Sequence, residues 1–272
     1  MSAVEEHRSD QHIVLSEHDG GLLRLTLNNP DRRNALSEDM LTRLQEEIDT
    51  AGASEDVKCI IIAARGPVFS SGHDLKQLSS HRSDRDGGRG YFTTVIGQCS
   101  QLMQSIVLLP KPVIAEVRGL ASAAGLQLAA SCDMVMAARS ARFCTPGVNI
   151  GLFCSTPMVA LTRVVQPRHA MEMLFTGDVF SAEDAYRFGL VNRIVPDNQL
   201  SEATEELARK LMSRSLEAIN IGKRAFAAQQ RLSLDHAYAH CNKVMVDNLM
   251  NEDADEGIGA FLEKRPPRWR GK

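Results

Sequence analysis

Two loops of small residues are the segments of this sequence best suited to chemistry. The first loop is residues 67–75 (PVFSSGHDL) and the second is residues 117–127 (VRGLASAAGLQ). Both contain glycine and alanine where a buried strand turns toward a helix, so backbone N–H groups can approach a ligand closely. Two such groups that converge at a helix N-terminus bind an anion or a developing oxyanion. Two tight turns required only by packing would contain the same residues, and the residues alone leave both interpretations open.

The elements that must position these loops predict an α/β core. A β-hairpin is expected around Asp19-Gly20-Gly21, and nearly continuous apolar runs predict buried strands. The strands are expected at residues 57–63, 112–117, 133–137 and 191–195. Helical patterns cover residues 37–51, 92–108 and 122–131, and the chain after residue 195 is helical to about 263. Strands that alternate with helices indicate βαβ units with parallel sheets. Residues 65–74 are expected to be a loop, and the charged, glycine-rich residues 79–90 a flexible surface loop.

This pattern divides the chain into three predicted parts. Residues 1–11 are expected to form a mobile tail, residues 12–200 the α/β core, and residues 201–272 a helical C-terminal region. The start of the sequence is acidic and polar and is neither a signal nor a transit peptide, so a natural targeting segment is expected to be absent from it.

Composition excludes several classes of protein. The 272 residues are 43% apolar and 24% charged, as in an ordinary soluble globular protein. A net charge of −3 gives no field that would attract nucleic acid or a membrane surface, and no apolar run approaches the roughly 18 residues of a membrane span. The six cysteines have no CxxC pair, which is typical of reduced thiols inside a cell. His236 and His240 share a helix face, but no third ligand is suitably spaced, so no metal site is predicted.

Four motifs in order resemble the enoyl-CoA hydratase/isomerase (crotonase) superfamily. They are NNPDRRNALS at residues 28–37, FSSGHDLK at 69–76, RGLASAAGLQLAASCDMVMA at 118–137 and FTGDVFSAEDAYRFGLVNRIVP at 175–196. The resemblance spans about residues 13–269. It implies the ClpP/crotonase-like fold, in which ββα units are stacked into two sheets and a helical C-terminal region forms a homotrimer or a dimer of trimers.

The resemblance also implies a site for an acyl-CoA thioester. Its oxyanion hole would consist of the backbone N–H groups of His73 and Ala124, and the His73 imidazole could also point into the pocket. Coenzyme A would be part of the substrate, with no separate cofactor and no metal. The substrate-binding residues carried over from the family are Arg33, Ala35, Ser71, Gly72, His73, Asp74 and Ala124.

The acid–base positions depart from the family pattern. Hydratases place one glutamate at the position of Gln127 and another at the position of Gly147. Hydration requires a group that deprotonates water and one that protonates the α-carbon, and neither residue can do either. Asp74 and Asp133 match structural positions of the family, and Glu116 remains a candidate acid on a strand that leads to the pocket.

The sequence therefore predicts an acyl-CoA thioester-binding protein of mitochondrial fatty-acid metabolism, in the matrix, that is not an ordinary enoyl-CoA hydratase. Two alternatives stay open. One is a catalytically silent regulatory or interaction protein of lipid metabolism, and the other is an enzyme that decarboxylates, hydrolyses or isomerises an acyl-CoA.

Overall fold

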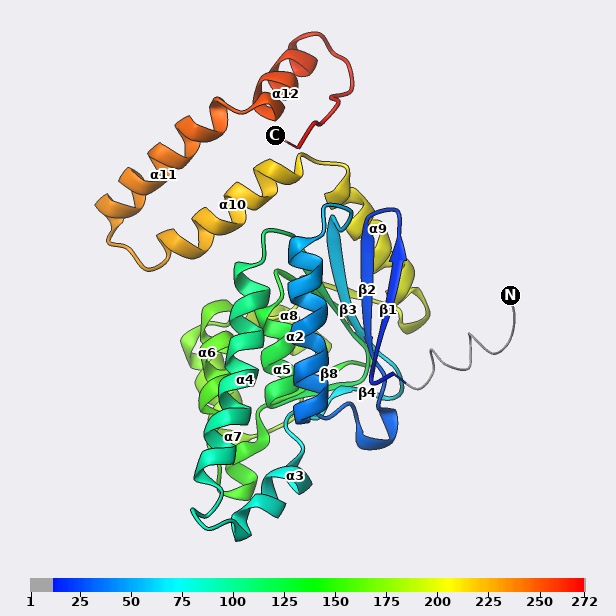
Figure 1. Ribbon diagram of the computed structural model, residues 1–272, viewed down its shortest axis with the longest axis vertical. Coiled ribbons are helices and arrows are strands. Elements are labelled where there is room, and N and C mark those ends of the chain that lie inside the picture. Colours follow the sequence, from blue (N-terminus) through cyan, green and yellow to red (C-terminus); the bar gives the residue numbers. More distant parts are fainter. Residues whose placement is uncertain (1–11, 272) are drawn as a thin grey trace.

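The computed structural model describes residues 12–271 as two β-sheets, the helices that cover them and a C-terminal helical arm (Figure 1). The mobile tail predicted at residues 1–11 lies outside the described residues. The division of the chain at residue 200 stays a prediction.

The larger sheet has six strands in the order β1-β2-β3-β5-β7-β10. They are Val14–Asp19, Leu22–Leu27, Cys59–Ala64, Val113–Val117, Met134–Ala138 and Arg193–Val195. β1 and β2 form the expected antiparallel hairpin, and every other neighbouring pair is parallel. β5 is buried at every position and β3 at all but its last, because helices cover both faces of this part of the sheet. The continuous apolar runs thus predicted these strands correctly.

The smaller sheet was not visible in the residue pattern. Its strands, in the order β4-β6-β8-β9, are Val68–Ser70, Leu120–Ser122, Arg142–Cys144 and Phe180–Ser181. Each has two or three residues, too few for an alternation of apolar and polar side chains to stand out. The loop predicted at residues 65–74 is therefore wrong in part, since it contains β4. The simple βαβ units expected from periodicity are ββα units, as the family resemblance implied.

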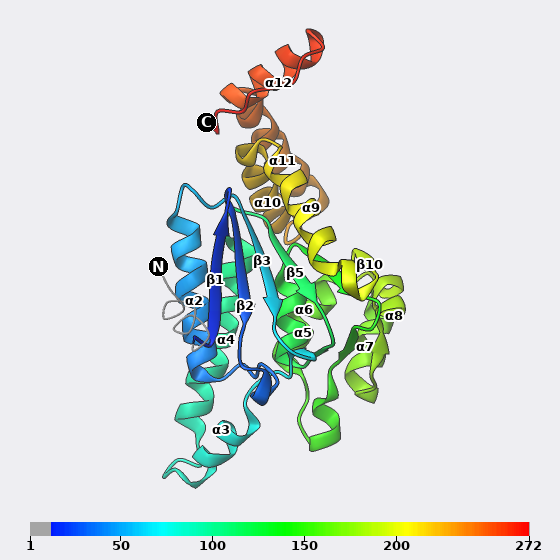
Figure 2. The same ribbon diagram turned by 90° about the vertical axis from the view of Figure 1, so that its right-hand side faces the viewer.

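Helices cover both faces of the larger sheet (Figure 2). α2 (Glu38–Ala53) and α4 (Arg89–Leu108) pack against each other, and α9 (Leu200–Met212) packs on β3, β5 and β7. α5 (Ala124–Ser131) is buried along its whole length. α2 begins where expected, because the Ser37 side chain accepts a hydrogen bond from Met40 N and caps the helix. The remaining core helices are η1 (Pro30–Arg32), η3 (Pro146–Ile150), α6 (Ser155–Val164), α7 (Pro167–Thr176), α8 (Ala182–Phe188) and η4 (Asp197–Gln199).

Residues 75–90 form short helical elements rather than the flexible loop expected at 79–90. α3 (Leu75–Ser80) runs into η2 (His81–Ser83) and then into a turn before α4. The Asp86 carboxylate accepts hydrogen bonds from Gly88 N at 3.0 Å and Gly90 N at 2.7 Å. The charged and glycine-rich composition was mistaken for a loop because a tied turn uses the same residues.

The C-terminal arm consists of α10 (Leu216–Gln229), α11 (Leu234–Leu249) and α12 (Glu252–Leu262), and it extends beyond the end of the sheet (Figures 1 and 2). Lys223 anchors α10 to the core: its ammonium group donates to the carbonyl oxygens of Ile106 (3.0 Å) and Lys111 (2.9 Å) and to the Asp133 carboxylate (2.7 Å). Within residues 12–271, none of the helices combines the length and the apolar content that a membrane crossing needs.

Candidate active site

The two predicted loops meet in the structure. Gly72 has a φ of +86°, and a Cβ added there would lie 3.0 Å from both the Ala124 nitrogen and the Ala123 Cβ. A Cβ added to Gly125 would lie 2.4 Å from the carbonyl oxygen of Ser70. The small residues therefore allow the two main chains to touch. The packing interpretation holds at Gly125, and at Gly72 it holds together with the requirement for a positive φ.

The backbone hydrogen bonds determine the direction of the two predicted oxyanion donors. Leu36 N donates to Gly72 O at 2.8 Å, and the Gly72–His73 peptide is trans, so the His73 N–H points the opposite way from that bond. Gln127 N donates to Ala123 O at 3.0 Å, so the Ala124 N–H likewise points away from the helix. Ala124 is the first residue of α5, where N–H groups have no acceptor within the helix and the helix dipole is positive.

Asn34 fixes the loop at residues 28–37 beside the first loop. Its buried amide nitrogen donates to Arg65 O at 2.9 Å and Val68 O at 2.7 Å, and its oxygen accepts from Asn29 N at 2.8 Å. The sequence analysis missed this positioning residue. The signal available was an asparagine in a turn, since Asn34 has a φ of +47° and asparagine tolerates such values.

The predicted coenzyme A contacts lie in the same loop. Arg33 is exposed and Ala35 is buried. The Arg33 carbonyl accepts a hydrogen bond from Ser71 N at 3.0 Å, which joins this loop to the first loop. The structure thus brings Arg33, Ser71 and Gly72 together.

The two acid–base positions differ in their surroundings. The Gln127 side chain is buried, and its Oε1 has no hydrogen-bond partner among the described residues. Gly147 is also buried, and a Cβ added there would lie 2.8 Å from Leu152 O and 3.0 Å from the sulfur of Cys154. The space that a carboxylate side chain would need at position 147 is therefore filled by the turn into α6.

His73 brings a second unpartnered group to the site. Both ring nitrogens are buried and have no hydrogen-bond partner within residues 12–271. Burial lowers the pKa of the imidazole, so the ring is neutral at neutral pH.

The other acids have structural partners. The Asp74 carboxylate caps α3, accepting from Lys76 N at 2.9 Å and Gln77 N at 3.2 Å. Asp133 accepts from Val113 N and from the anchor Lys223, and its burial raises its pKa. The structural roles predicted for both residues are confirmed, while substrate binding by Asp74 stays a prediction.

Glu116, the remaining candidate acid, is paired with a base. Its carboxylate accepts from the Arg24 guanidinium at 3.1 Å, which also contacts Glu205 of α9 at 3.2 Å. Glu116 is therefore directed toward the α9 side of the larger sheet, and this ion pair accounts for its burial.

No metal centre is present among the described residues, since no three His, Cys, Asp or Glu side chains are grouped to hold one. All six cysteines are free, as predicted. The arginines of the basic C-terminal segment are paired, because Arg265 binds Glu256 at 2.6 Å and Arg270 binds Glu252 at 3.4 Å. The Arg265 guanidinium lowers the pKa of Glu256 to about 2.

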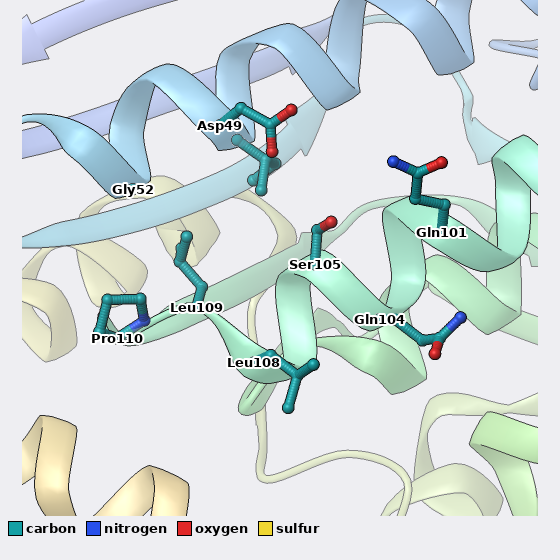
Figure 3. Close-up of a pocket in the computed structure, with 9 residues that line it drawn as sticks. Asp49, Gly52, Gln101, Gln104, Ser105, Leu108, Leu109 and Pro110 are labelled. Carbon is teal, nitrogen blue, oxygen red and sulfur yellow. The ribbon is translucent and has the colours of Figure 1, made fainter.

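A surface cavity of about 440 Å³ lies between α2 and α4 (Figure 3). Its lining is Ile48, Asp49, Gly52, Gln101, Gln104, Ser105, Leu108, Leu109 and Pro110. None of the predicted site residues lines it, so it is separate from the candidate active site.

Comparison with known proteins agrees with the four motifs. The family model described as enoyl-CoA hydratase/isomerase matches residues 17–272. The chain therefore belongs to the enoyl-CoA hydratase/isomerase family, and the predicted crotonase fold is confirmed.

Individual relatives are similar over most of the chain. The mitochondrial enoyl-CoA hydratase domain-containing protein 3 of Rattus norvegicus is 47% identical over 261 residues, which are 96% of this chain and 85% of that protein. The crystal structure of the human enoyl-CoA hydratase domain-containing protein 3 has a TM-score of 0.90 at 47% identity and covers 95% of this chain and 100% of its own. An enoyl-CoA hydratase structure from Mycobacterium smegmatis has a TM-score of 0.91 at 43% identity, covering 95% and 99%. The mitochondrial location expected from the resemblance is the one that the names of the rat and human relatives give.

Proposed function

We propose that this protein binds acyl-CoA thioesters and is not an ordinary enoyl-CoA hydratase. The thioester carbonyl oxygen accepts hydrogen bonds from the backbone N–H groups of His73 and Ala124. Membership of the family and the meeting of the two loops at Gly72 support this binding mode. Arg33 and Ala35 hold the coenzyme A part of the ligand, and no separate cofactor takes part.

The observation that carries the second half of the proposal is the filled space beside Gly147. Hydration of a double bond requires a base for water and an acid for the α-carbon. The Gln127 amide can orient a water molecule but cannot accept its proton. A carboxylate at position 147 would meet Leu152 O and the Cys154 sulfur. Burial raises the pKa of the nearby Cys144 and Cys154 thiols, so these do not replace a carboxylate base at neutral pH.

The protein acts in mitochondrial lipid metabolism under this proposal, and the names of the relatives support that location. The C-terminal arm supports assembly into a homotrimer or a dimer of trimers, because it leaves a large apolar surface uncovered in the single chain. Its exposed apolar side chains are Phe226, Leu232, Leu234, Tyr238, Met245, Val246, Leu249, Met250, Ile258, Phe261 and Leu262. Light scattering of the purified chain measures the mass of the assembly directly, and a monomer at micromolar concentration would contradict the trimer.

Isothermal titration with acetoacetyl-CoA tests the binding mode, because its enolate resembles the charge that an oxyanion hole stabilises. We expect micromolar binding that weakens at least tenfold in Ala124→Val, which adds bulk beside the donor. Ala239→Val makes the same change on an exposed position of α11 and should leave binding unchanged. No binding up to millimolar ligand would refute the proposal and direct the search to protein partners.

A hydratase assay with crotonyl-CoA tests the absence of ordinary hydration. We expect turnover far below that of a hydratase that has both glutamates, and turnover within tenfold of such an enzyme would contradict the proposal. Thioester substrates of decarboxylation, hydrolysis and isomerisation then separate a silent binder from an enzyme of another reaction.

A further inference from the structure

Buried polar atoms without a partner are concentrated around the candidate site. Among residues 12–271, seven buried side-chain nitrogen or oxygen atoms have no hydrogen-bond partner. Five of them belong to His73, Tyr91, Gln98 and Gln127. An unpaired buried polar atom is costly, so such atoms are normally satisfied by water or by a ligand.

These four residues come from elements that pack together. His73 follows Gly72, which touches Ala124, and Gln127 is one helical turn beyond Ala124 in α5. α4 packs on both α5 and α2 and carries the other two residues. Tyr91 and Gln98 are seven residues apart, so they lie on the same face of α4.

The four side chains carry no charge and mainly offer hydrogen-bond acceptors. The amide oxygens of Gln98 and Gln127 can only accept, and a neutral imidazole accepts through one of its nitrogens. Burial, with the nearby carboxylates of Glu38 and Asp74, raises the pKa of the Tyr91 phenol, which keeps it protonated. A ligand that supplies a proton therefore suits this lining better than one that only accepts.

Resting on the acyl-CoA pocket proposed above, we propose that His73, Tyr91, Gln98 and Gln127 form a polar lining that selects acyl groups bearing a hydroxyl. A hydrocarbon chain would leave the buried acceptors unpaired. An ionised carboxylate only accepts hydrogen bonds, and it would also face the negative charges of Glu38 and Asp74. Because positions 127 and 147 hold no acid–base pair, the hydroxyacyl thioester is retained without loss of its hydroxyl as water.

Isothermal titration with three matched thioesters tests this preference in the full chain. The ligands are butyryl-CoA, 3-hydroxybutyryl-CoA and malonyl-CoA. We expect 3-hydroxybutyryl-CoA to bind about tenfold more tightly than butyryl-CoA, the effect of pairing one buried acceptor. Malonyl-CoA should bind more weakly than butyryl-CoA.

Two conservative variants assign the preference to the lining. Tyr91→Phe removes only a hydroxyl, and Gln127→Met removes the amide at nearly constant volume; each should reduce the difference between the hydroxylated and plain ligands. Gln45→Met is the matched control, since Gln45 also has a buried amide oxygen without a partner but lies on α2, where its nitrogen binds Asp49 and Ser105. This control should keep the full difference.

The outcomes separate this inference from the proposed function. Equal affinity for butyryl-CoA and 3-hydroxybutyryl-CoA would mean that water satisfies the lining, and the inference would be wrong while acyl-CoA binding stands. Tighter binding of malonyl-CoA than of 3-hydroxybutyryl-CoA would also overturn it. If none of the three ligands binds, the proposed function itself fails.

Discussion

Replacing Gly72 by alanine should disable the site through one methyl group. Gly72 has a φ of +86°, and an L-residue in this region costs about 1–2 kcal/mol. The new Cβ would also lie 3.0 Å from the Ala124 nitrogen and 3.1 Å from Ser122 O, which are backbone atoms with little freedom to move. Overpacking of this kind adds about 1–3 kcal/mol, so we expect a total loss of stability of about 2–5 kcal/mol.

The same methyl group should weaken ligand binding because it crowds the Ala124 N–H. A hydrogen bond to a charged acceptor contributes about 1.5–3 kcal/mol, so losing it should weaken acetoacetyl-CoA binding by roughly 10- to 100-fold. Chemical denaturation measures the stability and isothermal titration measures the affinity.

Gly20→Ala is the matched control for this experiment. Gly20 lies in the hairpin between β1 and β2 with a φ of +56°, and a Cβ there would meet no atom within 4 Å. It should lose about 1–2 kcal/mol of stability and keep full affinity. Unchanged affinity in Gly72→Ala, at a temperature where that variant is folded, would refute the reasoning about the two donors.

Three further predictions concern other parts of the molecule. Gly147→Glu should lower the free energy of unfolding by at least about 3 kcal/mol and yield no crotonyl-CoA hydration, even with Gln127→Glu, because Leu152 O and Cys154 occupy the space; a stable, active double variant would contradict this. Lys223→Met should destabilise by about 3–5 kcal/mol in denaturant, since it leaves the Asp133 carboxylate buried without its partner, whereas Lys243→Met on the exposed surface of α11 should have little effect. Stability should fall as the pH drops below about 6.5, where an unfolded histidine binds a proton that buried His73 resists; His73→Gln should have a shallower pH slope between pH 5 and 7, and an identical slope would argue against a neutral His73.

The parts of the fold that the sequence predicted well are those determined by local pattern. The apolar runs of β3 and β5 and the Ser37 cap of α2 depend on neighbouring residues, so they can be read along the chain. β4, β6 and β8 have three residues each, and only pairing with one another makes them strands. The turn before α4 was misread because its order comes from the Asp86 carboxylate rather than from composition.

The site was predictable as two loops but not as a volume. The spacing of small residues identified the loops, and the family resemblance identified positions 127 and 147. The filling of position 147 depends on how the chain from Leu152 to Cys154 folds back, and the unpaired atoms of His73 and Gln127 depend on what surrounds them. Both are long-range properties that a local pattern does not contain.

The three hydrogen bonds of Asn34 also make the site sensitive to chemical ageing. Deamidation would replace the amide nitrogen by an oxygen and turn a double donor into an acceptor that faces two carbonyl oxygens, those of Arg65 and Val68. The segment that supports the first loop would then be pushed away from it, although the change in mass and shape is very small. The working life of the pocket therefore depends on how well the interior protects one amide from hydrolysis.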